Sequence, residues 1–288
     1  MVYILYNPLA GNRTCEEKSK AVGEIFASDE KQYVDMLTIE DYNTYFEGLS
    51  SEDRIVICGG DGTINYLINA TNLNELSQDI YYFPAGSGND FYHDIDSEGT
   101  NGVYRINDYL KCVPKVYVNS MEKYFINGIG YGLDGYCCEE GDKKRIQSPG
   151  EKVNYASIAL KGLFYAFKKV NAKVTVDGVT KEYSNVWMVP TMNGRFYGGG
   201  MMCAPDQDRL NEEGKVTVVV VHSKLRLLLL IAFLTIFKGT HVKHKSLVTV
   251  MTGSDVTVEF DRPTPLQIDG ETLSGVTKYS VKKEKSSR

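Results

Sequence analysis

Three glycines and an acid follow a short apolar run in the stretch Cys58-Gly59-Gly60-Asp61-Gly62-Thr63-Ile64-Asn65. The run Ile55-Val56-Ile57 predicts a buried strand, and residues 64–72 predict an amphipathic helix. Glycine loses more conformational freedom on folding than any other residue, so a cluster of glycines needs a reason. A glycine turn between a strand and a helix N-terminus is typical of sites where an anion approaches backbone N–H groups. A tight turn that binds nothing is the alternative.

The first 95 residues alternate strand and helix patterns, which predicts a parallel α/β sheet. The expected strands cover residues 2–6, 32–37, 54–57 and 80–83, and the expected helices cover 15–26, 39–48 and 64–72. Polar turns with glycine follow the first, third and fourth strands. Ligands bind at the carboxyl ends of the strands in such sheets, so these three turns should converge on one edge.

The rest of the chain is rich in strand patterns, expected at residues 115–119, 123–128, 172–176, 186–191, 215–221, 247–252 and 256–260. Two helices are expected among them, at 153–169 and 225–237. We therefore predict an α/β nucleotide-binding domain over residues 1–95 and a β-rich, sandwich-like or barrel-like domain over 96–282. We leave open whether the last strand packs back on the first domain. Residues 283–288 are expected to form a frayed, charged tail.

Composition narrows the class of protein. A formal net charge of −5 argues against a nucleic-acid binder, which would carry a basic surface. Six scattered cysteines fit neither a disulfide framework nor a zinc site, and the N-terminus reads as a strand rather than a signal peptide. We expect a cytoplasmic protein with reduced thiols, and we leave a homodimer open.

Residues 225–237 are almost entirely apolar and are flanked by Lys224 and Lys238. Thirteen residues are too few to span a bilayer as a helix, which needs about 20. A buried core helix is the simplest interpretation. The alternatives are the wall of an apolar ligand pocket or a peripheral contact with an anionic membrane surface, which nearby basic residues would favour.

The three turns carry the candidate ligand-binding residues. In the first turn, Asn7 and Gly11 can expose backbone to a phosphate and Arg13 supplies charge. Asp61 in the second turn would repel a phosphate unless a Mg²⁺ lies between them, so we interpret it as a metal-linked acid rather than a helix cap. Thr63 taken alone is a typical cap. The third turn offers Ser87 and Asn89, and Asp90 could cap a helix.

A second candidate group lies near the C-terminus, in Asp269-Gly270-Glu271. An acid on each side of a glycine turn is an ordinary hairpin feature. Beside a nucleotide site, however, either carboxylate could act as the general base that accepts a proton from a substrate hydroxyl. The glycines are not followed by the Gly-Lys-Ser/Thr of a P-loop, and no Gly-x-Gly-x-x-Gly follows the first strand.

Four motifs together resemble the diacylglycerol kinase catalytic-domain superfamily, which includes bacterial lipid kinases related to sphingosine and ceramide kinases. They are Asn7-Pro8-Leu9-Ala10-Gly11, Gly59-Gly60-Asp61-Gly62-Thr63, Gly86-Ser87-Gly88-Asn89-Asp90 and Asp269-Gly270-Glu271. The resemblance implies an NAD kinase-like α/β domain, a β-sandwich-like domain, and a lipid kinase that uses ATP and Mg²⁺. The acceptor would be diacylglycerol or a sphingoid base.

The resemblance also implies roles for individual residues. Asp269, Glu271 and Asp61 would be catalytic, and Asp134 and Lys161 would lie near the lipid. The residues implied in ATP binding are Asn7, Pro8, Gly11, Arg13, Thr38, Gly59, Gly60, Gly62, Thr63, Asn65, Gly86, Ser87 and Asn89.

A structural Mg²⁺ site is implied in residues 204–214, where Asp206, Asp208 and Glu213 would be ligands with Asp61 as a separate metal-linked acid. The loop is longer than in bacterial relatives and has Glu213 where they carry aspartate. Two alternatives to a lipid kinase remain: an NAD kinase-like enzyme, which shares Gly-Gly-Asp-Gly-Thr, and a catalytically idle lipid- or nucleotide-binding protein.

Overall fold

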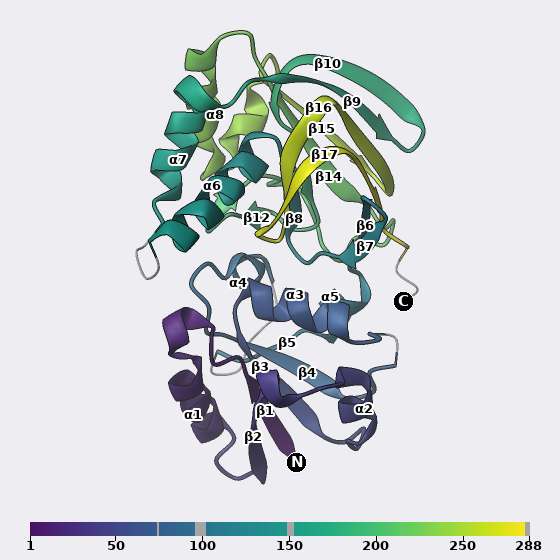
Figure 1. Cartoon of the computed structure of the whole chain (residues 1–288). Coiled ribbons are helices and arrows are strands. Elements are labelled where there is room, and N and C mark those ends of the chain that lie inside the picture. The colour runs from purple at the N-terminus through teal and green to yellow at the C-terminus, as the bar shows by residue number, and fades with distance from the viewer. Residues whose placement is uncertain (74, 96–101, 149–152, 286–288) are drawn as a thin grey trace. The chain divides into compact units, whose positions relative to one another are not determined.

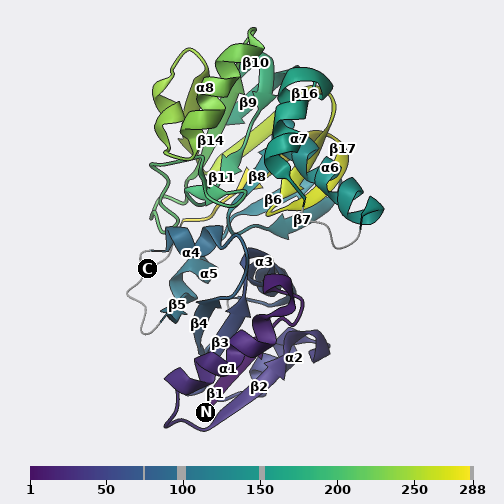
Figure 2. The same ribbon diagram turned by 90° about the vertical axis from the view of Figure 1, so that its left-hand side faces the viewer.

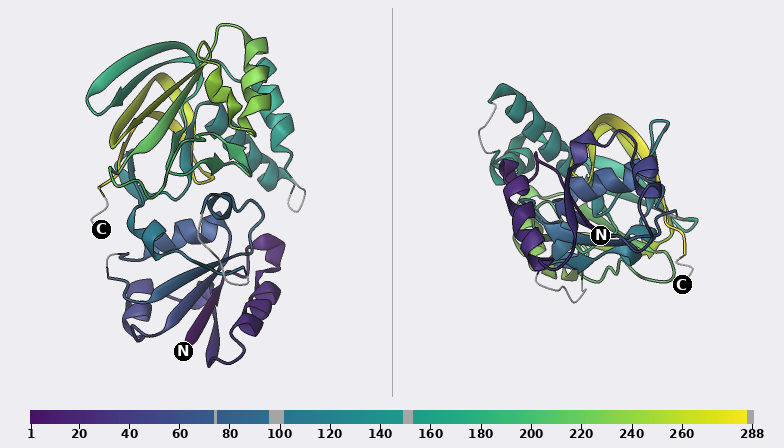
Figure 3. Two further views of the ribbon diagram at one scale, coloured as in Figure 1. Left: turned by 180° about the vertical axis from the view of Figure 1, so that it is seen from behind. Right: turned by 90° about the horizontal axis from the view of Figure 1, so that it is seen from below.

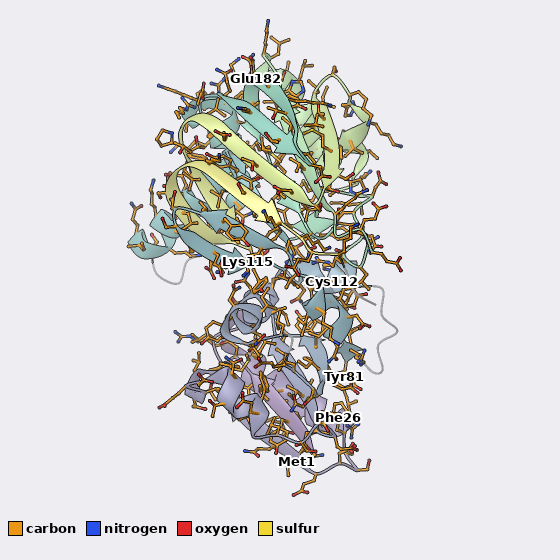
Figure 4. All side chains as sticks on the ribbon, turned by 90° about the vertical axis from the view of Figure 1, so that its right-hand side faces the viewer. Met1, Phe26, Tyr81, Cys112, Lys115 and Glu182 are labelled. Carbon is orange, nitrogen blue, oxygen red and sulfur yellow. The ribbon has the colours of Figure 1, made fainter. Side chains whose placement is uncertain are left out.

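The computed structural model describes residues 1–73, 75–95, 102–148 and 153–285. The chain divides into two compact units, Met1–Val113 and Pro114–Arg288, and Figure 4 marks Cys112 and Lys115 near the point where the first unit ends. The first unit extends past the predicted boundary at residue 95. The reason is that β5 (Tyr104–Arg105) pairs with β4 (Asp79–Pro84), and α5 (Asn107–Lys111) contacts the same strand.

The first unit contains the predicted parallel sheet, with strand order β2-β1-β3-β4-β5 (Figure 1). Only β5 runs antiparallel among the described strands of this sheet. The remaining strands are β1 (Val2–Tyr6), β2 (Lys31–Asp35) and β3 (Arg54–Gly59). The helices are η1 (Gly11–Arg13), α1 (Cys15–Ile25), η2 (Met36–Thr38), α2 (Tyr42–Glu47), α3 (Asp61–Ala70) and α4 (Asp90–Asp94).

Both faces of this sheet are buried. Ile4 and Val56 pack in one cluster with Cys15 and Val22 of α1, while the alternate strand residue Ile57 is equally buried on the other face. Strands buried on both faces read as continuous apolar runs, which is why residues 55–57 show no polar alternation.

The second unit is built around a ten-stranded antiparallel sheet. Strand β16 pairs with β8 through its last residues and with β9 through its first, so β16, β8, β11, β14, β10 and β9 form a closed, barrel-like ring. The strands are β6 (Lys115–Val118), β7 (Met121–Tyr124), β8 (Gly128–Tyr131), β9 (Val170–Val176), β10 (Val179–Met188), β11 (Thr191–Met192), β14 (Val216–His222), β15 (Val248–Gly253), β16 (Asp255–Ile268) and β17 (Glu271–Lys282), with a small hairpin of β12 (Phe196–Tyr197) and β13 (Met201–Met202).

Helices cover one side of this unit, as the views from the front and from behind both show (Figures 1 and 3). They are α6 (Leu133–Gln147), α7 (Tyr155–Lys161), the π-helical turn η3 (Gly162–Ala166), α8 (Arg226–Ile236) and η4 (Thr240–Lys243). Alternate residues of β14 divide between two cores: Val218 and Val220 lie in the cluster among the strands, and Val219 and Val221 in the cluster with the helices.

Two features of this unit differ from the expectations. Helix α6 was not predicted, because its sequence carries Gly135 and Gly141 and shows little apolar periodicity; Gly135 is needed where the helix meets the backbone of Pro265. Strand β17 pairs with β16 and β6 within the second unit. Lys283, expected in a frayed tail, is buried with 4% exposure.

Candidate active site

The three glycine-bearing turns of the first unit meet, as predicted. The Asn7 side-chain amide donates a hydrogen bond to Thr63 Oγ1 at 3.3 Å, which joins the first turn to the second. The N–H groups of Ala85 and Gly86 both donate to the carbonyl oxygen of Gly59, at 2.7 and 3.0 Å, which joins the third turn to the second. The carboxyl ends of β1, β3 and β4 therefore form one continuous loop cluster.

Glycine is required where the second and third turns touch. A Cβ atom on Gly60 would lie 2.9 Å from the Cα of Gly86, and one on Gly86 would lie 2.7 Å from Asn89 Oδ1. Gly62, one residue inside α3, has open space around the corresponding position. Helix α3 begins here with Gly60 as its N-cap, so the positive end of the helix faces the glycine cluster. This backbone surface suits an anionic ligand such as a phosphate.

Asp61 holds the second and third turns together. Its two carboxylate oxygens accept the backbone N–H groups of Asp90 and Phe91, at 3.0 and 2.8 Å, at the start of α4. The interpretation that Asp61 is not a helix cap was therefore wrong: its carboxylate caps α4. Each oxygen already accepts a hydrogen bond from the start of α4, so these contacts indicate a positioning role for Asp61.

The other predicted residues of the turns take several positions. Thr63 is buried and bonded to Asn7, and Gly60 is the N-cap of α3, so the cap role predicted for Thr63 alone was wrong. Asn89, with φ of 52°, donates to the Gly86 carbonyl at 3.1 Å and precedes α4. Ser87 is exposed at the same turn. Its hydroxyl is thus available to a ligand.

Four further predicted residues surround the cluster. Gly11, with φ of 59°, packs against the Ala85 carbonyl, which brings η1 to the third turn. Asn65 is buried in α3, and Pro8 is half-buried. Arg13 is exposed in η1.

Thr38 stands apart from the other predicted nucleotide residues. It follows β2, and its hydroxyl donates to the Asp35 carbonyl within the same turn, at 2.8 Å. Its described contacts are thus local to η2.

In the second unit, Asp269 is enclosed by backbone donors. The N–H groups of Asn127 and Gly128 donate to its Oδ1, both at 2.9 Å, and that of Ile126 donates to its Oδ2 at 2.6 Å. Asp269 also adopts a left-handed φ of 46° in the turn between β16 and β17, which is the predicted two-residue hairpin. Its carboxylate clamps the hairpin to the segment before β8, which leaves it poorly placed to accept a substrate proton.

Glu271 has the opposite environment. Its side chain is 70% exposed, and it forms an ion pair with Lys123 of β7, which is only 16% exposed. Two residues along the chain from Asp269, it presents a carboxylate to solvent on the rigid hairpin. Of the two predicted bases, Glu271 is thus the one whose carboxylate is open to solvent.

Asp134 occupies the first turn of α6 beside a second polar residue, Tyr197. The Tyr197 hydroxyl donates to Asp134 Oδ2 at 2.7 Å. Dense packing raises the pKa of the Asp134 carboxyl to about 7, although the hydrogen bond from Tyr197 lowers it. The side chain keeps a small accessible surface, and Tyr197 packs with Met192 and Cys203 in the cluster beneath the helices. A weakly acidic carboxyl thus lies in an apolar setting.

The raised pKa of Asp134 predicts a specific pH dependence of stability. Between about pH 4 and pH 7 the folded chain retains a proton on Asp134 that the unfolded chain, with an ordinary carboxyl pKa of 3.8, has lost. The free energy of unfolding should therefore fall as pH rises through this window. In urea unfolding from pH 4.5 to 7.5 we expect Asp134→Asn to flatten the slope of the free energy of unfolding against pH, which one retained proton sets at about 1.4 kcal/mol per pH unit. An Asp108→Asn control, exposed in the first unit, should keep the slope; an unchanged slope in Asp134→Asn would contradict the assignment.

Lys161, the other residue expected near a lipid, has an exposed side chain at the end of α7. The described contacts do not join it to Asp134.

The residues of the predicted structural Mg²⁺ site are not gathered around one point. Within the described ranges no three His, Cys, Asp or Glu side chains gather as a metal site, and Asp206, Asp208 and Glu213 are all exposed. Asp208 accepts the N–H of Leu210 at 2.8 Å, and Glu213 pairs with Lys215. Two of the three carboxylates thus have separate local partners, so the set as it lies does not fit the implied ion.

Two buried cations, Arg209 and Lys283, form hydrogen bonds in and beside this loop. The Arg209 guanidinium, 4% exposed, donates to the Ile126 carbonyl and to Asn127 Oδ1, the latter at 2.6 Å. The Lys283 ammonium donates to the Arg209 carbonyl at 2.7 Å and to Asn193 Oδ1 at 3.0 Å. Arg209 thus directly supports the backbone segment that donates to Asp269, and Lys283 supports it through Asn193, whose amide donates to the Ile126 carbonyl at 3.0 Å.

Sequence reasoning missed the partners of the acidic residues. Lys123, Tyr197, Arg209 and Lys283 belong to no recognisable motif. The one signal for Arg209 was its position inside the unusually long 204–214 loop, and Tyr197 could be suspected only from the neighbouring glycines 198–200.

Two family models match the chain. Residues 1–111 match the diacylglycerol kinase catalytic domain, and residues 127–282, more than half of the chain, match the YegS C-terminal NAD kinase beta sandwich-like domain. The two matches fall in the two compact units.

Relatives and solved structures agree with these matches. A Bacillus subtilis protein named "Putative lipid kinase YtlR" is 25% identical over 310 residues, which covers 97% of this chain and 95% of the relative. A Mycobacterium tuberculosis protein named "Diacylglycerol kinase" is 24% identical over 198 residues, covering 66% of this chain and 62% of the relative. A crystal structure titled as a putative diacylglycerol kinase from Bacillus anthracis has a TM-score of 0.69 and 18% identity, covering 99% of this chain and 92% of that one, which shows a shared fold.

Proposed function

Because the chain belongs to the family that joins a diacylglycerol kinase catalytic domain to a YegS C-terminal β-sandwich-like domain, we propose that it is an ATP-dependent lipid kinase. It transfers the terminal phosphoryl group of ATP to the hydroxyl of a lipid such as diacylglycerol or a sphingoid base. The observation that carries this proposal is the convergence of three glycine-bearing turns at the N-terminus of α3, where Gly60 touches Gly86.

The nucleotide part of the proposal rests on backbone chemistry. The close approach of Gly60 and Gly86 and the open space at Gly62 leave room for phosphate oxygens beside the positive end of α3. Ser87 offers a hydroxyl at the same place, and Asp61 keeps α4 and the third turn in position. These residues bind and orient the phosphates rather than react with them.

The second unit supplies the acceptor chemistry in this proposal. Glu271 accepts the proton of the lipid hydroxyl as its oxygen bonds to the γ-phosphorus, and the bond from that phosphorus to the β,γ-bridging oxygen breaks to release ADP. Lys123 holds the Glu271 carboxylate by an ion pair. Asp134 and Tyr197 form the polar group proposed to contact the lipid headgroup, with apolar side chains around them.

Labelled ATP tests the proposal directly. The purified chain is incubated with γ-labelled ATP and Mg²⁺ and with diacylglycerol, sphingosine or NAD in separate reactions. Label in an extracted lipid is expected. Label in NAD alone would support the NAD kinase-like alternative, and no transfer to any acceptor would support an idle binding protein. Omitting Mg²⁺ from the productive reaction tests the predicted metal requirement.

A further inference from the structure

Helix α8 is apolar on every side, and one of its faces is exposed. Leu229, Ala232 and Ile236 are buried against the second unit. Leu227, Ile231 and Leu234, spaced four and three residues apart, lie on another face with exposures of 70%, 42% and 71%. The simple expectation of a buried core helix therefore accounts for only half of this segment.

The exposed face continues onto a neighbouring element. Arg226 at the start of α8 donates to the Leu163 carbonyl of η3 at 2.7 Å, so the two elements are in contact. Figure 2 shows α8 and α7, the helix that η3 directly follows, on the side of the second unit that faces the viewer. Tyr165 of η3 is 84% exposed, and Leu225 and Phe237 at the two ends of α8 are 62% and 50% exposed. We name these exposed side chains of α8, its two ends and η3 the apolar face. Large exposed apolar patches on a protein mark interaction sites.

The charged residues in the two segments of the chain that carry the apolar face are all basic. Residues 153–176 and 214–254, which contain η3 and α8, hold ten Lys and Arg and no Asp or Glu. Since the whole chain has a formal net charge of −5, the remaining residues carry −15. Lys224, Lys238 and Lys245 are exposed, and Lys169 reaches the Lys224 carbonyl at 3.1 Å. Within the described residues these first three lysines form no ion pair.

We propose that the apolar face is a docking surface for an anionic lipid bilayer. Leucine and phenylalanine side chains would enter the boundary between headgroups and acyl chains, and the lysines would lie against the anionic headgroups. The helix would lie in the plane of the surface, because no helix in the described part of the chain is long and apolar enough to cross a membrane. Contact between two copies through this face is disfavoured, since it would bring two basic rims together.

This inference deepens the proposed function, because the acceptor of a lipid kinase resides in a bilayer, but it rests on separate residues. Binding is measured without ATP, and turnover is measured on lipid dispersed in detergent micelles. A chain that binds vesicles yet phosphorylates nothing would refute the proposed function alone. A chain that phosphorylates micellar lipid yet ignores vesicles would refute the docking surface alone.

Sedimentation with sucrose-loaded vesicles provides the test. The full chain should bind vesicles of phosphatidylcholine and phosphatidylglycerol far better than vesicles of phosphatidylcholine, and added salt should weaken this binding. Leu227→Glu/Leu234→Glu should reduce binding by at least about 10-fold, and Lys238→Ala by about 5-fold. Val179→Glu, at an equally exposed apolar residue of β10 (64%), is the matched control and should bind like the unmodified chain.

Thermal unfolding confirms that each variant is folded, and sedimentation velocity reports the oligomeric state. Unchanged binding by the double leucine variant, or equal loss in Val179→Glu, would overturn the proposal. A dimer in solution that the leucine substitutions dissociate would also overturn it, because the apolar face would then be an interface between copies. If the double variant misfolds, Lys238→Ala and Lys245→Ala test the same surface.

Discussion

Glu271→Gln is expected to lower kcat by about 10²- to 10⁴-fold, the usual contribution of a general base. Glutamine keeps the size of the side chain but cannot accept a proton. The substitution should leave the fold intact, because the Glu271 side chain is 70% exposed and it is the backbone of Glu271 that pairs with Ile268 to close the β16–β17 turn. Ion pairs open to solvent contribute about 0–1 kcal/mol, and the Glu271 half of the pair with Lys123 is open to solvent, so the free energy of unfolding should change by no more than about 1 kcal/mol.

A substitution at the neighbouring acid, Asp269, provides the comparison for this test. Asp269→Asn replaces an oxygen that accepts backbone N–H groups with an amide that donates, so it should destabilise the turn by about 1–3 kcal/mol. Asp269→Asn should thus lose activity and also unfold at a lower denaturant concentration. Glu271→Gln should lose activity without that change in unfolding. Glu259→Gln, a partly exposed ion-paired residue of β16, is the control that should retain full turnover. Near-normal kcat in Glu271→Gln would refute the role of Glu271 as the base.

The sequence was a good guide to the first unit because its signals are local. The apolar runs of β1, β3 and β4 are short, end at turns with glycine or proline, and precede helices, so these strands and the meeting of their turns could be predicted. Helix α6 was missed for the opposite reason. Gly135 serves a contact with β16, more than a hundred residues away, and Gly141 packs against Tyr155 of α7; both weaken the periodicity by which a helix is recognised.

The same holds for the candidate site. The sequence indicates which residues are candidates, but it does not show which groups those residues contact. The sequence could indicate that Asp61, Asp269 and Asp134 were special, since each follows a glycine or precedes one in a turn. It could not show which carboxylate was occupied by N–H groups and which was free to react. That distinction depends on segments distant in the chain: residues 126–128 meet Asp269, and residues 90–91 meet Asp61.

The buried cations beside the loop of residues 204–214 could likewise not be predicted from the sequence. Three acids in residues 204–214 read as ligands, while Arg209 and the distant Lys283 read as surface residues. In the folded chain the acids are exposed and the two cations are buried on carbonyl and amide oxygens. Burying a charge is costly unless its hydrogen bonds are satisfied, and here backbone carbonyls of several segments satisfy them.

Asp61→Asn is expected to raise the KM for ATP on the order of 100-fold. The carboxylate accepts two N–H groups of α4, and hydrogen bonds to a charged group contribute about 1.5–3 kcal/mol each. Asparagine can accept only one of them and turns a donor toward the other. The third turn, with Ser87 and Asn89, would then lose the position in which it meets Gly60. Steady-state kinetics at saturating acceptor measure this effect.

The same variant separates positioning from metal binding. If Asp61 acts by capping α4, the KM for ATP rises at every saturating concentration of Mg²⁺, and the concentration of Mg²⁺ that gives half-maximal activity stays the same. If it were a metal ligand, that concentration would rise and excess Mg²⁺ would restore turnover. Asp79→Asn, which removes an exposed ion pair with Arg105 at the opposite end of β4, is the matched control and should keep a normal KM. A normal KM in Asp61→Asn as well would show that the link between the turns does not hold the nucleotide.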